Sequence, residues 1–447
     1  MAVAERLQGM IRLPADKSIA HRALLLNAMG HGTATVTAHR PGADVHSTAH
    51  ALAALGLVYR LSDDGEPTVR FHVTGGGTPE RAGLPLGPSS EVTLDCGNSG
   101  TLMRLLAGAA TTRPGRTILT GDPSLTSRPM DRIAVPLRSI GASVTTTETH
   151  PPIIIDGGHQ LESGTHTLKV ASAQVLGAII LASLPTPGTT EIDVPGPTRD
   201  HTERMLAWLG VDIRRDGLTT RLTGPAGWEA RDVVVPTDPS AAAFWLVAGA
   251  VHPDSHITLP YVGLNPTRLG VIRILERMGA DITVSAAETD GPEPAGDITV
   301  RSAGRLAAVD LGAEDVADVI DELPVLAVAM ASARGTSTVS GAGELRVKES
   351  DRIRLVVEGL ATVGVDITET ADGWTITGAP VRTAGPEGVA AREAAPSEIV
   401  TDGDHRIAMA FAVADVVGVG TRGALPDDPE CAAVSYPTFW DDLESLT

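Results

Sequence analysis

Apolar and polar positions recur along this chain in two patterns, and the first predicts a helix that turns into a strand. In each copy, a helix-like apolar run ends in Leu-x-x-apolar-Gly and a β-branched segment follows. The five copies are Leu52–Gly56, Leu137–Gly141, Leu206–Gly210, Leu275–Gly279 and Leu360–Gly364. Glycine at this place permits the left-handed backbone conformation that ends many helices, and the alternation after it is typical of a strand.

The second pattern is an alanine-rich helix, a Gly or Pro-Gly turn and a Thr/Val-rich strand. Its six copies are Leu24–Val36, Leu102–Ile118, Val175–Ile192, Ala241–Ile257, Val325–Val339 and a last one from Ile407 through Gly420 onward. The glycines of the first pattern lie 85, 69, 69 and 85 residues apart, which favours copies of one structural unit. We therefore expect an α/β fold of six βαβαβ-type repeats. The C-terminus cuts the sixth repeat short, and we expect the N-terminal strand Met10–Leu13 to complete it.

Six repeats divide naturally into two domains of three. Pro-containing extended segments precede helices near Pro14–Ser18 and near Val235–Ser240, and such segments are suitable places for the chain to pass between domains. Domain I would then comprise residues 1–17 and 236–447, and domain II residues 18–235. Lys17 would lie at one crossover, beside a cleft between the two domains. A doubly wound sheet also alternates helices and strands, but the chain lacks a βαβ glycine fingerprint.

Composition and charge exclude several classes of function. The formal charge of −20 argues against binding nucleic acid or anionic membranes. Cys96 and Cys431 are the two cysteines, too few for a disulfide framework or a cysteine-rich zinc site. No apolar run reaches about 18 residues, and the first ten residues lack the apolar region of a signal peptide. We expect a cytoplasmic protein without a cysteine-rich metal site.

The stretch Glu344–Arg352 packs three cations and three carboxylates into nine residues. If residues 346–354 were helical, Lys348 and Arg352 would lie on one face, where like charges repel. That arrangement would make sense at an anion-binding site. A solvated helix with the ion pairs Glu349–Arg352 and Asp351–Arg354 explains the charges equally well.

Polar clusters also stand at the starts of the alanine-rich helices. They lie at residues 17–22, 97–104, 172–174, 321–322 and 404–406. Helix N-termini attract anions, although ordinary N-capping also explains each cluster by itself. For Asp321, capping and general-base chemistry are equally compatible with the sequence. If these helix starts converge, several cations in an acidic protein imply a ligand with several negative charges.

The motifs, in their order along the whole chain, resemble those of the 5-enolpyruvylshikimate-3-phosphate synthase (3-phosphoshikimate 1-carboxyvinyltransferase) family. The matching pieces are Lys17-Ser18 with Arg22, Cys96 through Arg104, Arg128-Pro129-Met130, Ser172-Ala173-Gln174, Asp321-Glu322, Arg346 through Arg352, and Asp404-His405-Arg406. The resemblance implies a two-domain inside-out α/β barrel (the enolpyruvyl transferase fold) with three repeats per domain. It also favours a binding site at Glu344–Arg352.

The resemblance implies two substrate-binding sets in the cleft between the domains. Shikimate 3-phosphate would be held by Lys17, Ser18, Arg22, Ser172, Ala173, Gln174, Thr198, Asp321, Glu344 and Lys348. Phosphoenolpyruvate would be held by Lys17, Gly100, Arg128, Gln174, Arg352 and Arg406. Of these, Lys17 would also be catalytic.

The implied activity is transfer of the enolpyruvyl group to the 5-hydroxyl of shikimate 3-phosphate, a step of the shikimate pathway of aromatic amino acid biosynthesis. The reaction would proceed by addition and elimination through a tetrahedral intermediate that loses phosphate. Asp321 would accept the hydroxyl proton, and Glu349 would act as acid and base at the methylene carbon. The resemblance implies no cofactor, metal, nucleic acid or membrane partner, and we expect a monomer. Because Gly100 is present, we expect the herbicide glyphosate to find no steric block there.

Three positions depart from the family pattern. Val434 precedes Ser435-Tyr436-Pro437 where many members have lysine, Thr198 replaces the usual serine, and Glu344 replaces an asparagine found in some members. Val434 leaves open a weakened relative that binds phosphorylated carboxylates without turnover. A UDP-N-acetylglucosamine enolpyruvyl transferase is a second alternative. The first motif lacks its Lys-Asn pair, and the Arg-Pro loop at Arg128 lacks its cysteine.

Overall fold

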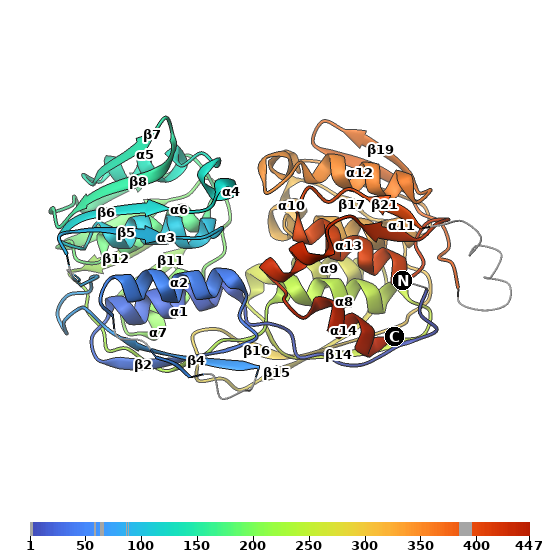
Figure 1. The fold of residues 1–447 in the computed structure, drawn as a ribbon, viewed down its shortest axis with the longest axis horizontal. Helices are drawn as coiled ribbons and strands as arrows, with labels where there is room; N and C mark the ends of the chain where they lie inside the picture. Colours follow the sequence, from blue (N-terminus) through green and yellow to red (C-terminus); the bar gives the residue numbers. More distant parts are fainter. Residues whose placement is uncertain (1–2, 58–59, 63–66, 86, 88, 384–395) are drawn as a thin grey trace. The chain divides into compact units, whose positions relative to one another are not determined.

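The protein is an α/β protein whose contacts divide it into two compact units (Figure 1). The computed structural model describes residues 3–57, 60–62, 67–85, 87, 89–383 and 396–447. Unit 1 comprises Met1–Pro14, Thr237–Thr289 and Pro294–Thr447, and unit 2 comprises Ala15–Pro236 and Asp290–Glu293. The chain therefore begins in unit 1, forms unit 2 and returns to unit 1.

Unit 2 contains, among its described residues, three four-stranded sheets built alike. Its strands are β2 (Thr33–His39), β3 (Arg60–Ser62), β4 (Thr68–Thr74), β5 (Glu91–Asp95), β6 (Gly115–Thr120), β7 (Ser143–Thr147), β8 (His150–Gly157), β9 (Gly164–Thr167), β10 (Gly188–Asp193), β11 (Ile213–Asp216), β12 (Thr219–Gly224) and β13 (Val233–Val234). The sheet orders are β13-β2-β4-β3, β5-β6-β8-β7 and β9-β10-β12-β11. In each sheet the first two strands are parallel and the other two neighbouring pairs are antiparallel.

Unit 1 repeats this arrangement twice and adds a shorter sheet in its described part. Its strands are β1 (Leu7–Met10), β14 (Ser255–Gly263), β15 (Asp281–Ala287), β16 (Ala295–Arg301), β17 (Asp310–Leu311), β18 (Thr336–Val339), β19 (Asp366–Thr370), β20 (Gly373–Thr377), β21 (Ser397–Ile399) and β22 (Ala424–Pro426). The four-stranded sheets are β1-β14-β16-β15 and β17-β18-β20-β19, with the same parallel and antiparallel pairings. Strands β21 and β22 form a parallel pair.

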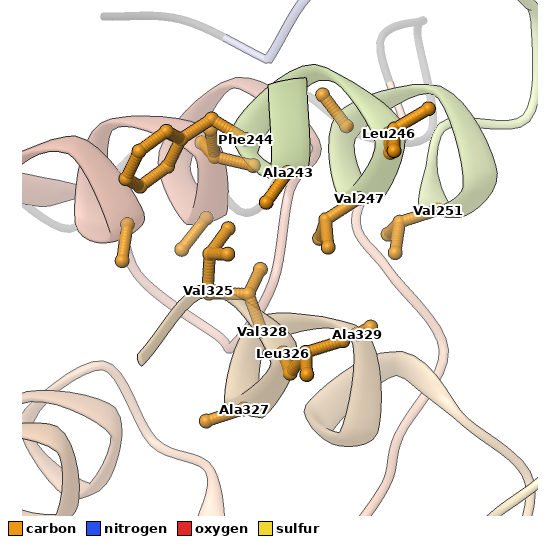
Figure 2. Packing of buried hydrophobic residues seen from close by; sticks show 14 of the residues in the cluster. Ala243, Phe244, Leu246, Val247, Val251, Val325, Leu326, Ala327, Val328 and Ala329 are labelled. Atoms are coloured by element: carbon orange, nitrogen blue, oxygen red, sulfur yellow. The ribbon is translucent and has the colours of Figure 1, made fainter. Parts of the chain in front are cut away.

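The alanine-rich helices of the second sequence pattern form the middle of each core. In unit 2 they are α1 (Lys17–Met29), α3 (Gly100–Ala110) and α6 (Ala173–Ser183), and in unit 1 they are α8 (Pro239–Val251), α11 (Leu323–Ser332) and α13 (His405–Val416). Helices α8, α11 and α13 contact one another, and α3 contacts both α1 and α6. Figure 2 shows apolar side chains such as Val247 of α8 and Val328 of α11 between the two helices. Helices that are apolar on all sides are buried on all sides.

The helices of the first sequence pattern end at glycines, as predicted. They are α2 (Ala43–Ala54), α5 (Asp131–Ser139), α7 (His201–Trp208), α9 (Gly270–Arg277) and α12 (Arg352–Thr362). The glycines after them have φ values from +80° to +93°, at Gly56, Gly141, Gly210, Gly279 and Gly364. Each helix leads into a strand, namely β3, β7, β11, β15 and β19. The left-handed conformation expected at these glycines is confirmed.

Shorter helices complete the described structure. They are α4 (Pro123–Thr126), η1 (Pro266–Arg268), α10 (Ala313–Val319), η2 (Gly343–Val347), η4 (Pro429–Val434) and α14 (Phe439–Leu446). Within the described ranges, no helix combines the length and apolar character needed to span a membrane.

The partner predicted for the N-terminal strand is wrong. Strand β1 pairs in parallel with β14, with Leu7 opposite Ser255, so it completes the first sheet of unit 1. It does not complete the repeat that the C-terminus cuts short. The strand also lies earlier than the predicted Met10–Leu13. The corresponding position in the first sheet of unit 2 is taken by β13, which pairs with β2.

Candidate active site

The start of α1 carries Lys17, Ser18 and Arg22. Asp16 caps the helix by accepting a hydrogen bond from the Ile19 backbone N–H at 3.0 Å. Because Asp16 caps the helix, the side chains of Lys17 and Ser18 in the first turn are not needed for capping. Lys17 Nζ lies 3.0 Å from Asp44 Oδ2, and the lysine side chain remains about a third exposed.

Arg22 is buried beneath this first turn. Its Nε donates to Thr202 Oγ1 at 2.8 Å, and its Nη1 donates to the Ser18 carbonyl oxygen at 2.9 Å. Burial lowers the pKa of Arg22 to about 10, and the carboxylate of Glu203 acts in the opposite direction. The guanidinium therefore stays protonated at neutral pH and keeps a positive charge close to Ser18.

The start of α3 presents backbone rather than side chain at Gly100. Ser99 caps the helix by accepting from the Leu102 N–H at 3.3 Å. A Cβ atom on Gly100 would lie 3.0 Å from Arg104 Nη1 and 3.6 Å from Arg128 Nη1. Glycine is thus the residue that lets two guanidinium groups approach the helix start closely. Cys96 nearby is buried and burial raises the pKa of its thiol, in accord with a structural role.

The start of α6 is joined to α3 through Gln174. Gln174 Oε1 accepts from Arg104 Nη1 at 2.5 Å, and Gln174 Nε2 donates to Thr101 Oγ1 at 2.9 Å. Ser172 caps α6 by accepting from the Val175 N–H. The predicted residues Gly100, Arg128, Ala173 and Gln174 are therefore brought into one region of unit 2, together with Arg104.

Thr198 lies in the loop before α7. Its hydroxyl oxygen is buried and has no hydrogen-bond partner among the described residues. Its carbonyl oxygen accepts from Arg215 Nη1 at 3.1 Å, and this bond holds the loop. A buried hydroxyl without a protein partner is a natural place for a ligand group or a water molecule.

In unit 1, three cations surround Asp321, which lies between α10 and α11. Lys348 Nζ and Arg352 Nη1 lie 3.5 Å and 3.8 Å from Asp321 Oδ1. Arg406 Nη1 donates to the Asp321 carbonyl oxygen at 2.8 Å. The N-cap position of α11 is taken by Glu322, whose side chain makes no capping bond. The carboxylate of Asp321 is thus directed at cations, and the capping alternative is not the one observed.

Arg352 is the central cation of this cluster. It is 1% exposed, and its Nε and Nη2 donate to the two carboxylate oxygens of Asp404 at 2.8 Å and 3.2 Å. Its Nη2 also lies 2.7 Å from Glu349 Oε2. Burial acts to lower the pKa of Arg352, but the charges of Asp404 and Glu349 raise it above its ordinary value. The arginine is therefore a fixed positive charge with a fixed orientation.

The premise of one helix over residues 346–354 is wrong. Residues 343–347 form the 3₁₀ helix η2, and α12 begins only at Arg352 because Asp351 caps it by accepting from the Arg354 N–H at 3.1 Å. Lys348 and Arg352 therefore do not share a helix face. Lys348 lies before α12 and Arg352 is the first residue of α12, and both side chains approach Asp321. The expected Glu349–Arg352 contact is present, whereas Arg354 pairs with Glu358 and Asp402.

Two predicted positions stand apart from this cluster. Glu344 is exposed in η2, and no hydrogen bond or ion pair among the described residues joins it to Asp321. Val434 is half-buried at the end of η4. The segment after it is anchored by Tyr436, whose hydroxyl accepts from Trp245 Nε1 of α8 at 3.1 Å.

Arg104 and Asp404 belong to the site but were missing from the predicted set. Both lie inside the quoted motifs, where Asp404 has the sequence signature of an N-cap and does cap α13 through the Arg406 N–H at 2.9 Å. Its second task, holding Arg352, depends on a residue 52 positions away. Arg104 could have been predicted from the sequence, because it lies four residues after Gly100 and therefore on the same face of the helix.

Comparisons with known proteins agree with these motifs. Residues 2–443 match the sequence model of the family described as EPSP synthase (3-phosphoshikimate 1-carboxyvinyltransferase). The 3-phosphoshikimate 1-carboxyvinyltransferase of Halorhodospira halophila is 45% identical over 444 residues, which cover 98% of this chain and 94% of the relative. That of Geobacillus thermodenitrificans is 42% identical over 442 residues, which cover 98% of this chain and 96% of the relative.

Solved structures agree as well. EPSP synthase from Acinetobacter baumannii is 37% identical and superposes with a TM-score of 0.85, covering all of this chain and 97% of that one. The enolpyruvyl transferase NikO from Streptomyces tendae shares the fold at 18% identity, with a TM-score of 0.74. On these grounds the chain belongs to the EPSP synthase (3-phosphoshikimate 1-carboxyvinyltransferase) family.

Proposed function

We propose that this protein transfers the enolpyruvyl group of phosphoenolpyruvate to the 5-hydroxyl of shikimate 3-phosphate and releases phosphate. Membership of the family supports the reaction. The observation that carries it to this chain is the Asp321 cluster, in which Lys348 and Arg352 lie 3.5 Å and 3.8 Å from the carboxylate and Arg406 donates to the backbone carbonyl oxygen of the same residue. A carboxylate beside these cations can take a proton where anionic substrates are held.

We propose that the two units form an inside-out barrel pair of three repeats each, with the substrates in the cleft between them. Residues 1–17 and 236–447 would form one domain and residues 18–235 the other. The five sheets with one strand arrangement support the repeat assignment. Shikimate 3-phosphate would contact Lys17, Ser18, Arg22, Ser172, Ala173, Gln174, Thr198, Asp321, Glu344 and Lys348. Phosphoenolpyruvate would contact Lys17, Gly100, Arg128, Gln174, Arg352 and Arg406.

In the proposed mechanism, Asp321 accepts the proton of the 5-hydroxyl as its oxygen bonds to C2 of phosphoenolpyruvate. Glu349 gives a proton to the methylene carbon, and the tetrahedral intermediate forms. Glu349 then takes a proton back from the new methyl group while the bond between C2 and the phosphate oxygen breaks, and the proton held by Asp321 leaves with the phosphate. Arg352 lies 2.7 Å from Glu349 and orients its carboxyl group. Lys17 and the arginines stabilise the negative charge on the carboxylate and the departing phosphate.

The decisive experiment mixes the protein with shikimate 3-phosphate and phosphoenolpyruvate and follows phosphate release. We expect release by the wild type, and none by Asp321→Ala or Lys17→Met with the fold preserved by circular dichroism. Lys169→Met changes an exposed lysine of unit 2 and is the matched control. Unchanged turnover in either site variant would contradict the assignment.

Val434 supports a second candidate, a protein that binds phosphorylated carboxylates with little turnover. This reading predicts substrate binding by calorimetry without phosphate release. Val434→Lys would then restore release if the missing lysine is the cause. Release by the wild type rules this candidate out.

Glyphosate provides a separate prediction about Gly100. A methyl group at this position would crowd Arg104 Nη1 at 3.0 Å and contact Arg128 Nη1 at 3.6 Å, and glycine leaves that space open. We expect glyphosate to inhibit phosphate release by the wild type in competition with phosphoenolpyruvate. An inhibition constant in the range of glyphosate-resistant enzymes would contradict this prediction. The expected cytoplasmic location and monomeric state stay predictions.

A further inference from the structure

Arg128 is held by a short relay of side chains that ends at Asp122. Arg128 Nη2 donates to Asn98 Oδ1 at 2.9 Å, and Asn98 Nδ2 donates to Asp122 Oδ2 at 2.8 Å. The other oxygen of Asp122 caps α4 by accepting from the Leu125 N–H at 2.7 Å. Ser124 of α4 offers Arg128 Nη2 a second acceptor at 3.3 Å. All of these residues belong to unit 2.

The chemistry of the three groups permits one orientation of the Asn98 amide. A guanidinium can only donate hydrogen bonds, and an ionised carboxylate can only accept them. The amide must therefore turn its NH₂ group to Asp122 and its oxygen to Arg128. Rotating the amide by half a turn would oppose two donors at one end and two acceptors at the other. Asp122 thus determines which end of Asn98 faces Arg128.

The backbone on both sides of the relay has little room to move. The Asp122 N–H donates to the Gly97 carbonyl oxygen at 2.9 Å. A Cβ atom on Gly121 would lie 2.5 Å from that same oxygen. Because the two loops are in close backbone contact, the positions of Asn98 and Asp122 are fixed relative to each other. The amide rotation is the remaining degree of freedom, and the carboxylate removes it.

We propose that Asp122 is a positioning residue that acts through Asn98 on the guanidinium of Arg128. This inference rests on the proposed function, in which Arg128 binds phosphoenolpyruvate. With Nη2 held by Asn98, Nη1 lies beside the start of α3, 3.6 Å from the place of a Gly100 Cβ. The relay therefore presents the arginine to the substrate in one orientation before the substrate arrives, which lowers the entropy cost of binding.

A double-mutant cycle of Asn98→Asp and Asp122→Asn tests the relay. Asn98→Asp sets two carboxylates against each other, so their repulsion turns the new side chain away from Asp122 and out of its position beside Arg128. Asp122→Asn is isosteric, and asparagine caps helices as well as aspartate does, but its NH₂ group must face either Asn98 or the Leu125 N–H. In the double variant, hydrogen-bond donors and acceptors alternate again from Leu125 to Arg128.

The relay predicts non-additive effects on the KM for phosphoenolpyruvate. We expect Asn98→Asp to raise this KM by about tenfold or more, the loss expected when a hydrogen bond to a charged group fails. Adding Asp122→Asn should lower the KM again, so that the double variant lies well below the product of the single effects. The KM for shikimate 3-phosphate should change by less than about twofold, since the relay touches one substrate's arginine.

Asp156→Asn is the matched control, because it removes a carboxylate from an exposed ion pair with Arg116 in the same unit. It should leave both KM values unchanged. Single effects that multiply in the double variant would overturn the proposal, as would equal changes in the two KM values.

A second readout separates this proposal from the proposed function. If the wild type releases no phosphate, the proposed function fails. The relay is then tested without substrate, from the ¹⁵Nε signal of Arg128 in the NMR spectrum. We expect a sharp signal in the wild type and the double variant and a broadened one in Asn98→Asp. The same signal in all four proteins would overturn the relay.

Discussion

Asp404 shows how one residue can serve local structure and chemistry together. Its side chain is almost fully buried, yet it caps α13, accepts from Nε and Nη2 of Arg352 and accepts from Ser350 Oγ at 2.9 Å. A buried charge is tolerated when its lone pairs are all used. Removing one partner leaves the other charge buried and uncompensated, which costs more than the pair contributes when intact.

We therefore expect Asp404→Asn to lower the free energy of unfolding by about 3 kcal/mol, because the Arg352 charge stays buried. Urea unfolding of wild type and variant measures the difference. Asp402→Asn breaks a surface pair with Arg354 and is the control, with an expected change below about 0.5 kcal/mol. Equal effects of the two variants would contradict this account of Arg352.

The same pair predicts a pH dependence. Burial acts to raise the pKa of Asp404, but Arg352 lowers it below its ordinary value. A carboxyl group with a lowered folded-state pKa adds stability above the unfolded value of about 3.9, and this contribution is lost as pH falls through the folded value. The stability difference between wild type and Asp404→Asn should therefore shrink below about pH 4. A difference that stays constant down to pH 3 would contradict the pairing.

Among the helices, α1, α2 and α3 meet at His21. Its Nδ1 lies 2.5 Å from Thr48 Oγ1 of α2, and its Nε2 lies 3.2 Å from the hydroxyl of Ser99, which caps α3. Burial lowers the pKa of His21 to about 3. The imidazole is consequently neutral at ordinary pH and bonds two hydroxyl groups, and it ties the Gly100 end of α3 to the Lys17 end of α1.

His21 should make the protein sensitive to mild acid. The folded protein keeps the ring neutral down to about pH 3, while the unfolded chain binds a proton near pH 6.5. Stability therefore falls as pH drops through this window, by up to about 1.4 kcal/mol per pH unit from this group. His21→Gln should reduce that slope by the same amount, as measured by urea unfolding between pH 4 and 6.5. The exposed His72→Gln should leave it unchanged; equal slopes in both variants would count against a buried neutral ring.

Close packing of α3 on α6 depends on Gly108. A Cβ atom there would lie 2.1 Å from the Ala178 carbonyl oxygen, which is backbone and cannot move aside. Glycine-to-alanine changes inside helices ordinarily add about 0.5–1 kcal/mol of stability. We expect Gly108→Ala to destabilise by about 1–3 kcal/mol instead, because the helices must separate. Separation would also stretch the Arg104–Gln174 bond and raise both KM values.

Urea unfolding measures whether Gly108→Ala raises or lowers stability. A gain would mean that helix propensity dominates at Gly108, and a loss would mean that packing dominates. Gly312→Ala is the control, because a Cβ atom there meets nothing within 4 Å. Stabilisation by Gly108→Ala would show that the two helices have room to adjust.

Sequence patterns correctly predicted the elements that are determined by neighbouring residues. These elements are the glycine helix ends and the alanine-rich helices. Lys348 and Arg352 were wrongly placed on one helix, because the periodicity of the sequence does not show that Asp351 caps α12 and that a new helix begins there. The partner of β1 lies some 248 residues away at Ser255, and no local pattern encodes such a pairing. Asp404 was missed as a site residue for the same reason.

At the scale of the whole molecule, each unit has its own apolar core. One core runs from Ala4 to Leu446 within unit 1, and the other from Ala15 to Val235 within unit 2. Separate cores allow each unit to open without the other, so a free energy of unfolding measured in urea is expected to belong to the unit that carries the substitution.

Core variants should therefore act on one unit at a time. Leu326→Ala in unit 1 and Leu181→Ala in unit 2 each remove a fully buried side chain, at a cost of about 2–5 kcal/mol. Hydrogen exchange followed by mass spectrometry should show faster exchange in the altered unit alone. Faster exchange throughout both units would mean that they unfold as one body.

The pairing of β13 with β2 affects the order in which the units can form during synthesis. Unit 2 is complete, apart from Asp290–Glu293, once the ribosome has passed Pro236. The Asp16 N–H then finds the Pro236 carbonyl oxygen at 2.8 Å, which ties the two ends of the unit together. Strand β1 leaves the ribosome first, yet it must wait for β14, roughly 250 residues later. At translation speeds of about 5–20 residues per second, it remains without its partner strand for roughly 12 to 50 seconds.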